Sequence, residues 1–421
     1  MLERSFRVTA AVVIATALLA PNARADELIA TISVDAGERE RLDTPVSVSL
    51  PTTIEAWQPL RLVEVRGERT TSVPHQVEPG DPARLWFVLR GETEAGAARE
   101  FRLLRRASPD DSPAKGPVSL ALGARTLDVR FGEQELFRYN HAHVVPPEGV
   151  EFKFVRSGYI DPMYGPSGEL LTEDFPADHY HHKGIWMPWT KTEFEGHEVD
   201  FWNLGALQGT VQFAGFERFE SGPVYGRFRV RHEHVDLQQP GGGKVVLEEL
   251  WDVRVWTVGG PDEGYWLWDL TSEQTCVADS PLHLKAYRYG GLGWRGPKAW
   301  NGDDYQILSS EGKTRKDAHA TRSSWCAHSG ETDGERTTVV ILCHSANERF
   351  PEPMRTWDNG MVFFNYVPPQ KEDLDLLPGV KHVFRYRFFI HSGGIDEERA
   401  RSAWSDFCEG PKASLRLATG E

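Results

Sequence analysis

Cysteine is scarce in this sequence, with 4 residues among 421. No two of them form a Cys-x-x-Cys pair, so the sequence indicates neither a structural zinc site nor a redox motif. An oxidising compartment would allow one or two disulfides. Cys343 ends the apolar run Val339–Cys343, and such a position is typical of a buried free thiol.

Long apolar runs are almost absent too. The longest, Val8–Ala20, is too short to span a bilayer. Arg4 and Arg7 precede it, and Ala23–Ala25 follows with the small-x-small pattern that signal peptidase cleaves. We therefore predict a signal peptide over residues 1–25 and a periplasmic or secreted protein without membrane insertion. An uncleaved anchor is the less favoured alternative because the run is short.

Basic residues are outnumbered, with 47 Lys and Arg against 62 Asp and Glu, a formal net charge of −15. A surface of this sign repels nucleic acid and anionic lipid, so no nucleic-acid partner is predicted. A local basic pocket would still admit an anionic substrate. No Gly-x-Ser-x-Gly, Walker or Gly-x-Gly-x-x-Gly pattern stands in the structural context that it requires, which disfavours serine hydrolases and nucleotide enzymes.

Helical periodicity is rare, whereas apolar and polar residues alternate in many short segments. Val46–Leu50, Phe228–Arg231 and Phe384–Phe388 are clear cases, and such alternation is typical of antiparallel sheets with one buried face. Only the segment after Ile395 has the spacing of an amphipathic helix. The sequence therefore predicts an all-β fold, a large antiparallel β-sandwich with a short C-terminal helix.

A polar, proline-containing stretch over residues 107–117 indicates a linker or a long loop. We predict an N-terminal β-sandwich region over residues 26–117 and a main β-sandwich domain with the C-terminal helix over residues 118–421. One continuous large sandwich is the alternative. No internal repeat is visible, which argues against a propeller or a solenoid.

The densest group of chemically active residues is Asp174–Gly184. We predict Asp178, His179, His181 and His182 as catalytic residues, because imidazole serves as acid or base near neutral pH and can ligate metals. In an extended segment His179 and His181 would share one face and His182 would point the opposite way. The alternative is that these rings bond only to the backbone of a loop.

Tryptophans follow directly after this group. Trp186 and Trp202 are predicted to bind substrate, since sugar rings pack their C–H faces on indole while carboxylates and amides meet the hydroxyls. Asp200 and Asn203 flank Trp202. The alternative for each tryptophan is an ordinary core residue.

A third group lies in the segment 283–291. On a strand, His283, Lys285 and Tyr287 would line one face. We predict His283 for proton transfer, and Lys285 and Tyr287 for substrate binding. Glu249 would supply the opposing carboxylate, although a solvated surface position is an equal alternative.

The last group begins at the end of an apolar run. We predict His344 as a catalytic residue, with Asn347, Arg349 and Arg355 as substrate-binding residues. The arginines could hold a carboxylate or sulfate with paired hydrogen bonds. The alternative is a loop held by salt bridges.

These motifs, in this order, resemble the DUF6807 family of bacterial proteins. The resemblance covers about residues 137–392 and rests on Tyr159–Glu169, Asp178–Gly184, Asp200–Trp202, His344–Asn347 and Arg355. It implies a β-supersandwich like that of galactose mutarotase-like proteins, and with it carbohydrate chemistry. The family is often labelled methane oxygenase PmoA, but such a subunit needs a membrane-spanning or anchored segment, which the mature chain lacks.

We therefore expect a carbohydrate-active enzyme outside the cytoplasm, acting by hydrolysis, β-elimination or epimerisation. His181 or His179, together with Asp178 or Glu249, would transfer protons, and Lys285 or Arg355 would hold an acidic group. One alternative is a non-catalytic carbohydrate-binding protein. Another is a divalent metal on His179 and His181 with Asp178; no other cofactor is implied.

Overall fold

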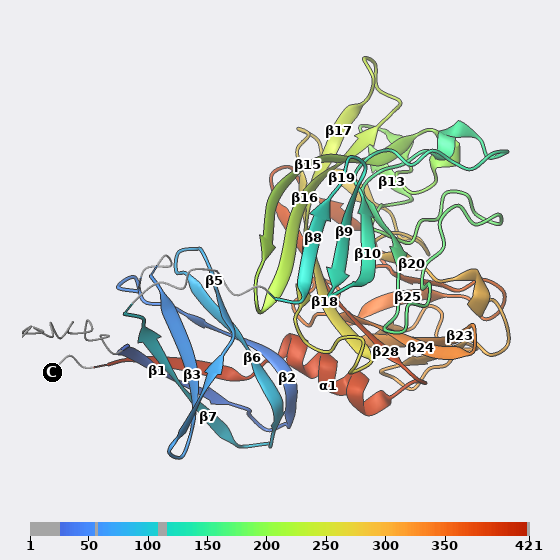
Figure 1. The fold of residues 1–421 in the computed structure, drawn as a ribbon. Coiled ribbons are helices and arrows are strands. Elements are labelled where there is room, and N and C mark those ends of the chain that lie inside the picture. Colours follow the sequence, from blue (N-terminus) through green and yellow to red (C-terminus); the bar gives the residue numbers. More distant parts are fainter. Residues whose placement is uncertain (1–25, 55–57, 108–115, 419–421) are drawn as a thin grey trace, which may run out of the picture.

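The computed structural model describes residues 26–54, 58–107 and 116–418, so the predicted signal peptide lies outside it. The described chain consists mainly of antiparallel strands with one α-helix, which confirms the predicted all-β fold (Figure 1). Its four cysteines are free, and Cys343 is buried as expected. Within the described ranges, no helix is long and apolar enough to cross a membrane.

The N-terminal region holds two sheets, with strand orders β29-β1-β7-β3-β4 and β2-β6-β5. Their bounds are β1 Glu27–Asp35, β2 Arg41–Ser49, β3 Leu60–Arg66, β4 Arg69–Val73, β5 His75–Glu78, β6 Arg84–Thr93, β7 Ala98–Arg105 and β29 Lys412–Leu417. Alternate residues such as Ile32, Leu62 and Phe87 fill a core of their own. The division near residue 117 stays a prediction, which this separate core supports.

Strand β29 is an exception to that predicted division. The sequence placed all residues after 118 in the main domain, but β29 pairs with β1 over Ala30–Asp35. The chain leaves the C-terminal helix beside the free edge of β1, and an added strand satisfies the hydrogen-bonding groups of that edge.

The main region is a sandwich of two large sheets, with orders β22-β25-β26-β20-β12-β11-β10-β9-β8 and β15-β16-β17-β18-β28-β24-β23-β21. The first contains β8 Val118–Leu122, β9 Thr126–Phe131, β10 Gln134–Asn140, β11 Tyr159–Met163, β12 Ile185–Trp186, β20 Gly293–Arg295, β22 Arg322–Ser323, β25 Glu352–Thr356 and β26 Phe363–Tyr366. The second contains β15 Gly209–Ser221, β16 Tyr225–Asp236, β17 Lys244–Trp256, β18 Tyr265–Cys276, β21 Gln306–Ser309, β23 Trp325–Thr332, β24 Glu335–Cys343 and β28 Lys381–Ser392.

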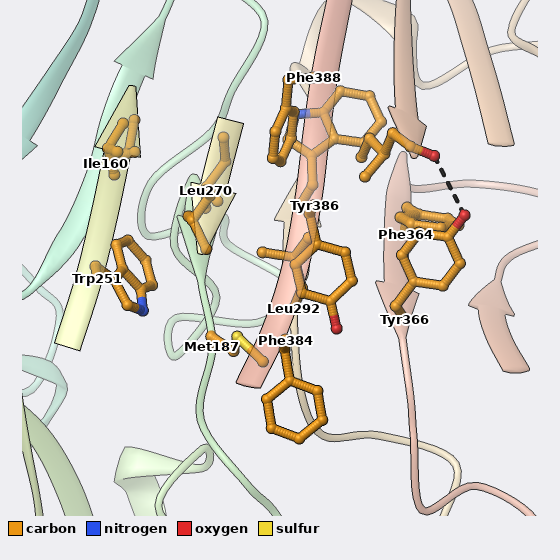
Figure 2. Close-up of a cluster of buried hydrophobic side chains, with 14 of the residues drawn as sticks. Ile160, Met187, Trp251, Leu270, Leu292, Phe364, Tyr366, Phe384, Tyr386 and Phe388 are labelled. Carbon is orange, nitrogen blue, oxygen red and sulfur yellow. Dashed lines mark hydrogen bonds between the residues drawn. The ribbon is translucent and has the colours of Figure 1, made fainter. Parts of the chain in front are cut away.

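Large side chains from both sheets meet in the core between them (Figure 2). The Trp268 ring stacks on Phe388, with centroids 4.0 Å apart. The Tyr366 hydroxyl donates to the Ile341 carbonyl at 3.2 Å, which links the two sheets. Such contacts fix the strand ends, from which the loops of the site extend.

Smaller elements complete the described fold. A four-stranded sheet has the order β14-β13-β19-β27, with β13 Thr192–Phe194, β14 His197–Val199, β19 Leu282–Leu284 and β27 Leu374–Leu376. Short 3-10 helices span η1 Phe152–Phe154, η2 Leu204–Ala206 and η3 Lys298–Trp300.

The predicted C-terminal helix is confirmed as α1, Glu397–Cys408, and Asp396 caps its N-terminus by accepting from the Arg399 amide at 3.0 Å. Its apolar side packs on the eight-stranded sheet, where the Trp404 indole donates to the Cys343 carbonyl. Its polar side forms an ion pair between Asp406 and Arg41. The helix therefore joins the main sandwich to the N-terminal sheets (Figure 1).

Candidate functional site

The histidine-rich segment lies in the loop between β11 and β12. It is a series of turns rather than an extended strand: the His179 amide donates to Pro176 at 2.9 Å, and the His182 amide donates to His179 at 2.8 Å. The expectation that His182 points away from His179 is therefore wrong. Their rings stack at 4.6 Å, and His181 meets the His182 ring edge-on at 4.8 Å.

Arg295 of β20 holds the outer part of this loop. Its guanidinium donates to both oxygens of Asp178, at 2.9 and 3.2 Å, and to Glu173 at 3.1 and 3.2 Å. Partial burial alone would raise the pKa of Asp178, but the hydrogen bonds from Arg295 outweigh it and the pKa falls below its ordinary value. The geometry thus makes Asp178, predicted as catalytic, an anchor of the loop.

Lys183 holds the inner part of the loop. Its ammonium donates to Asp174 at 2.8 Å and lies 3.0 Å from the Phe175 ring centroid. The Tyr159 hydroxyl donates to the other oxygen of Asp174 at 2.6 Å. Burial lowers the pKa of Lys183 to about 8. At Gly184 the chain runs against the Ile160 carbonyl, which leaves no room for a side chain.

The three histidine side chains reach a pocket of about 260 Å³. Segments far apart in sequence form it: the histidine loop, the chain from β12 to η2, the loop after β19 and the end of β25. Its lining comprises His179, His181, His182, Thr190, Asp200, Trp202, Asn203, Tyr287, Arg288, Tyr289 and Trp357. Of the predicted site residues, the structure brings together His179, His181, His182, Trp202 and Tyr287 here.

Burial controls the proton affinities in this pocket. Burial and, to a lesser extent, the neighbouring His179 and Arg156 together lower the pKa of His181 to about 4. Burial also lowers the pKa of His182. The Nδ1 atom of His182 lies 3.4 Å from a guanidinium nitrogen of Arg295, a donor, so the proton of the neutral ring belongs on Nε2. Both rings are therefore neutral at pH 7, and the acceptor nitrogen of His182 faces Arg295.

Asp200 is the acidic member of the lining. One of its oxygens accepts from the backbone amides of Trp202 and Asn203, at 2.8 Å each. Burial raises its pKa, against those two hydrogen bonds. This carboxyl therefore has one oxygen fixed by the backbone and an increased affinity for a proton.

The two predicted tryptophans differ in position. Trp202 lines the pocket, but Trp186 is fully buried behind it, with ring centroids 4.7 Å apart. Because β12 is an inner strand of its sheet, the Trp186 ring packs among Trp202, His182 and Phe363. Trp186 is thus a core residue that supports the site, and its prediction as a substrate-binding residue is corrected.

Glu249 lies far inside the sandwich. It is 1% exposed and accepts from Trp251 at 2.7 Å and Gln274 at 3.0 Å, with the His234 Nε2 atom 3.0 Å away. It is not part of the pocket lining. The prediction of a catalytic Glu249 is wrong because the alternation of β17 turns this residue toward the core.

The third predicted group is divided. Strand β19 ends at Leu284, so the alternation that would align His283, Lys285 and Tyr287 does not continue. His283 bonds to Asp375 at 2.7 Å, and Lys285 pairs with Asp373. Both lie outside the pocket lining, whereas Tyr287 is part of it.

The predicted residues His344, Asn347 and Arg349 form a structural turn after β24, away from the pocket. The His344 ring accepts from the Ala346 amide at 2.9 Å. The Asn347 amide donates to the buried Glu352 at 2.8 Å. Arg349 pairs with Glu372 at 2.6 Å, so the alternative of a salt-bridged loop holds here.

Arg355 is different, because its guanidinium borders the pocket. It lies 4.6 Å from the Trp357 ring centroid and 5.2 Å from that of Tyr289, and both rings belong to the lining. It also donates to the Tyr289 hydroxyl at 3.3 Å.

Sequence reasoning did not select part of the lining as site residues, namely Thr190, Asp200, Asn203, Arg288, Tyr289 and Trp357, although it noted Asp200 and Asn203 beside Trp202. A signal existed, since each except Thr190 stands within two residues of a residue selected as a site candidate. The sequence did not show which of these neighbours share one surface.

The described residues contain no group of three or more His, Cys, Asp and Glu arranged to hold a metal ion. In the predicted metal site, the carboxylate of Asp178 would be the third ligand beside His179 and His181. This carboxylate is already bound by Arg295. The donor set thus leaves only imidazoles for a metal at His179 and His181.

This architecture defines an antiparallel β-sandwich protein with a pocket of aromatic rings and histidines. The chain belongs to DUF6807, a family of unknown function, whose model matches residues 126–405. That description carries no activity, so it gives no support to the methane oxygenase label.

None of the curated proteins matches this chain. Among solved structures, heparan sulfate lyase HepC from Pedobacter heparinus is similar with a TM-score of 0.32 and 10% identity, covering 70% of this chain. A mutant of that lyase gives the same TM-score and identity and covers 69% of this chain. The match spans 38% of the lyase chain in both cases.

Proposed function

We propose that this protein is a carbohydrate-active enzyme that binds a sugar ring in the pocket and uses a neutral histidine as its base. The convergence of three histidines and Asp200 on one aromatic pocket carries the proposal. The rings of Trp202, Tyr289 and Trp357 offer flat faces for the C–H side of a sugar, and polar groups between them suit its hydroxyls.

Proton abstraction fits this pocket better than hydrolysis. Glycoside hydrolysis ordinarily needs two carboxyl groups on opposite sides of the scissile bond. Among the described residues of the lining, Asp200 is the one carboxylate. His181, neutral because its pKa is about 4, is the base that we propose. Epimerisation and β-elimination, which begin with removal of a proton from a sugar carbon, are therefore favoured.

Proton NMR of the mature protein with a panel of neutral and acidic oligosaccharides tests the proposal. New reducing ends, unsaturated uronate signals or anomer exchange would each identify a reaction. The His181→Ala variant should abolish that signal while its circular dichroism stays unchanged. The matched control is His283→Ala, since His283 lies outside the lining. Full turnover by His181→Ala would contradict the assignment.

A non-catalytic carbohydrate-binding protein is the second candidate. One observation favours it: Asp178 and Glu249, two of the predicted acids, are bound within the fold. It predicts saturable line broadening of a sugar without product after long incubation, in the same NMR experiment.

We also propose that the protein works in the periplasm or outside the cell, after cleavage of residues 1–25. Expression with the native N-terminus followed by N-terminal sequencing checks this. The first residue found should be Asp26; retention of Met1 would contradict export by cleavage.

A further inference from the structure

Two arginines at the pocket, Arg288 and Arg355, lack the acidic partners that Arg295 and Lys285 have. Arg295 binds Asp178 and Glu173, and Lys285 binds Asp373. Among the described residues, no ion pair within 4.0 Å joins Arg288 or Arg355 to a carboxylate. In a protein with a net charge of −15, acidic partners are plentiful, so two unpaired guanidinium groups at one pocket are informative.

Arg355 is the more buried of the two, with 9% of its surface exposed. Its guanidinium donates to the Thr356 carbonyl at 3.1 Å and to the Tyr289 hydroxyl at 3.3 Å, while its Nε has no partner. A guanidinium offers five N–H donors, and a buried cation without a counter-ion is costly. The faces of Trp357 and Tyr289 offset only part of that cost.

Arg288 is exposed and belongs to the pocket lining. Its guanidinium lies 5.5 Å from the Tyr289 ring centroid, so both arginines lie close to the same ring. The charges of both arginines act on His319. Burial lowers the pKa of His319, and the positive charges of Arg355, Lys371 and Arg288 also lower it, while Asp358 has a smaller opposite effect. This end of the pocket is therefore positively charged although the whole protein is acidic.

We infer that the sugar bound in this pocket carries a negatively charged group, held by Arg288 and Arg355 beside Tyr289. The inference rests on the proposed function and names its substrate class, an anionic glycan. A carboxylate and a sulfate ester share the required chemistry, because both accept paired hydrogen bonds from a guanidinium. Because the acidic protein as a whole repels polyanions, binding depends on this local pair of cations.

Isothermal titration calorimetry of the mature protein with three probes tests the inference. The probes are tetragalacturonate, a sulfated carrageenan tetrasaccharide and neutral galactotetraose. We expect at least one acidic probe to bind at least tenfold more tightly than galactotetraose. Arg288→Gln and Arg355→Gln should each weaken binding of the preferred acidic probe far more than binding of galactotetraose, and so remove most of that preference.

Arg349→Gln is the matched control, because Arg349 is an arginine outside the lining that pairs with Glu372. It should leave all three affinities unchanged. Thermal melting checks whether Arg355→Gln, a change at a buried position, still folds. Arg288 is exposed, so Arg288→Gln decides the question even if the other variant unfolds. A carboxylate and a sulfate are told apart by which acidic probe shows the preference.

The outcomes separate the two ideas. Equal affinity for neutral and acidic probes, or equal weakening of both by Arg288→Gln, overturns the inference and leaves a carbohydrate function standing. Selective binding of an acidic probe that is never converted supports the inference and contradicts the enzyme. Absence of binding to all three probes overturns the inference together with the function on which it rests.

Discussion

Two histidine-bearing segments of the main sandwich, the loop at His179–His182 and the turn at His344–Arg349, look alike in sequence but differ in the structure. In the turn, His344 and Asn347 bond to neighbouring backbone and buried groups. In the loop, anchors outside the triplet hold the chain, and the three histidine rings line the pocket.

Both segments have an outside anchor for the backbone: Lys183 and Arg295 hold the loop, and Arg322 donates to the Arg349 and Pro351 carbonyls of the turn. The difference lies in the side chains. Those of His344 and Asn347 bond within the fold, whereas the three rings of the loop line a pocket. The comparison teaches that a cluster of polar residues becomes a candidate site when its side chains face a pocket. Variants in the two segments and at the pocket should show this difference.

The largest effect should come from His181. A base removed from a proton-transfer step costs about 10²–10⁴-fold in rate, so His181→Ala should lower kcat/KM by that factor with its fold intact. His344→Ala should keep wild-type kcat/KM and lower the melting temperature, because its ring packs on Phe407 of α1. Steady-state kinetics with calorimetric melting measures both. An inactive His344→Ala variant together with a fully active His181→Ala variant would contradict a catalytic His181 and a structural His344.

The second prediction concerns pH. The folded-state pKa of His181, about 4, lies below the ordinary histidine value of 6.5. Its contribution to stability is therefore complete above pH 6.5 and is lost as pH falls toward 4. Between pH 6.5 and pH 4, each such histidine should lower the free energy of unfolding by roughly 1.4 kcal/mol per pH unit. Urea unfolding at pH 7, 5.5 and 4.5 should show a shallower decline in His181→Ala than in wild type.

Parallel declines of the two proteins would contradict a depressed pKa for His181. His328 makes the comparison sharper, because burial lowers its pKa to about 3 although it is a core residue outside the pocket. A low histidine pKa therefore marks burial, and only the pocket lining makes it a candidate for chemistry.

The third prediction addresses the turn. Asn347 is 4% exposed, and its amide bonds to the buried Glu352 and to both backbone groups of Arg385. Asn347→Ala leaves these groups unsatisfied and should lower the free energy of unfolding by about 1–3 kcal/mol. Turnover at 25 °C should stay at the wild-type value. Loss of turnover in a variant that remains folded would return Asn347 to the site.

The sequence was sufficient for the fold class, because alternation over short segments and one helical pattern depend on local chemistry. It was also sufficient to locate the histidine loop. The alternation of β17 also indicates where Glu249 lies. Glu249 shares its strand face with Leu247 and Trp251, which are buried. That spacing could have placed Glu249 in the core.

The composition of the pocket could not be predicted in the same way. It depends on which loops the sandwich brings together, and Trp202, Tyr289 and Trp357 are separated by long stretches of chain. The pairing of β29 with β1 likewise joins the two ends of the described chain. Such contacts follow from packing over the whole molecule and leave no local pattern.

The smallest effect should come from Lys285, which the sequence placed in the binding site. Its ammonium pairs with Asp373 at the surface, and both side chains are more than a third exposed. Exposed pairs are screened by solvent and contribute little, so Lys285→Gln should change neither the melting temperature nor the affinity for an acidic oligosaccharide. Arg288→Gln, a change of the same charge at a lining position close by in sequence, should weaken that affinity. If the two variants behave alike in calorimetry, net charge rather than position governs binding, and the distinction between paired and unpaired cations fails.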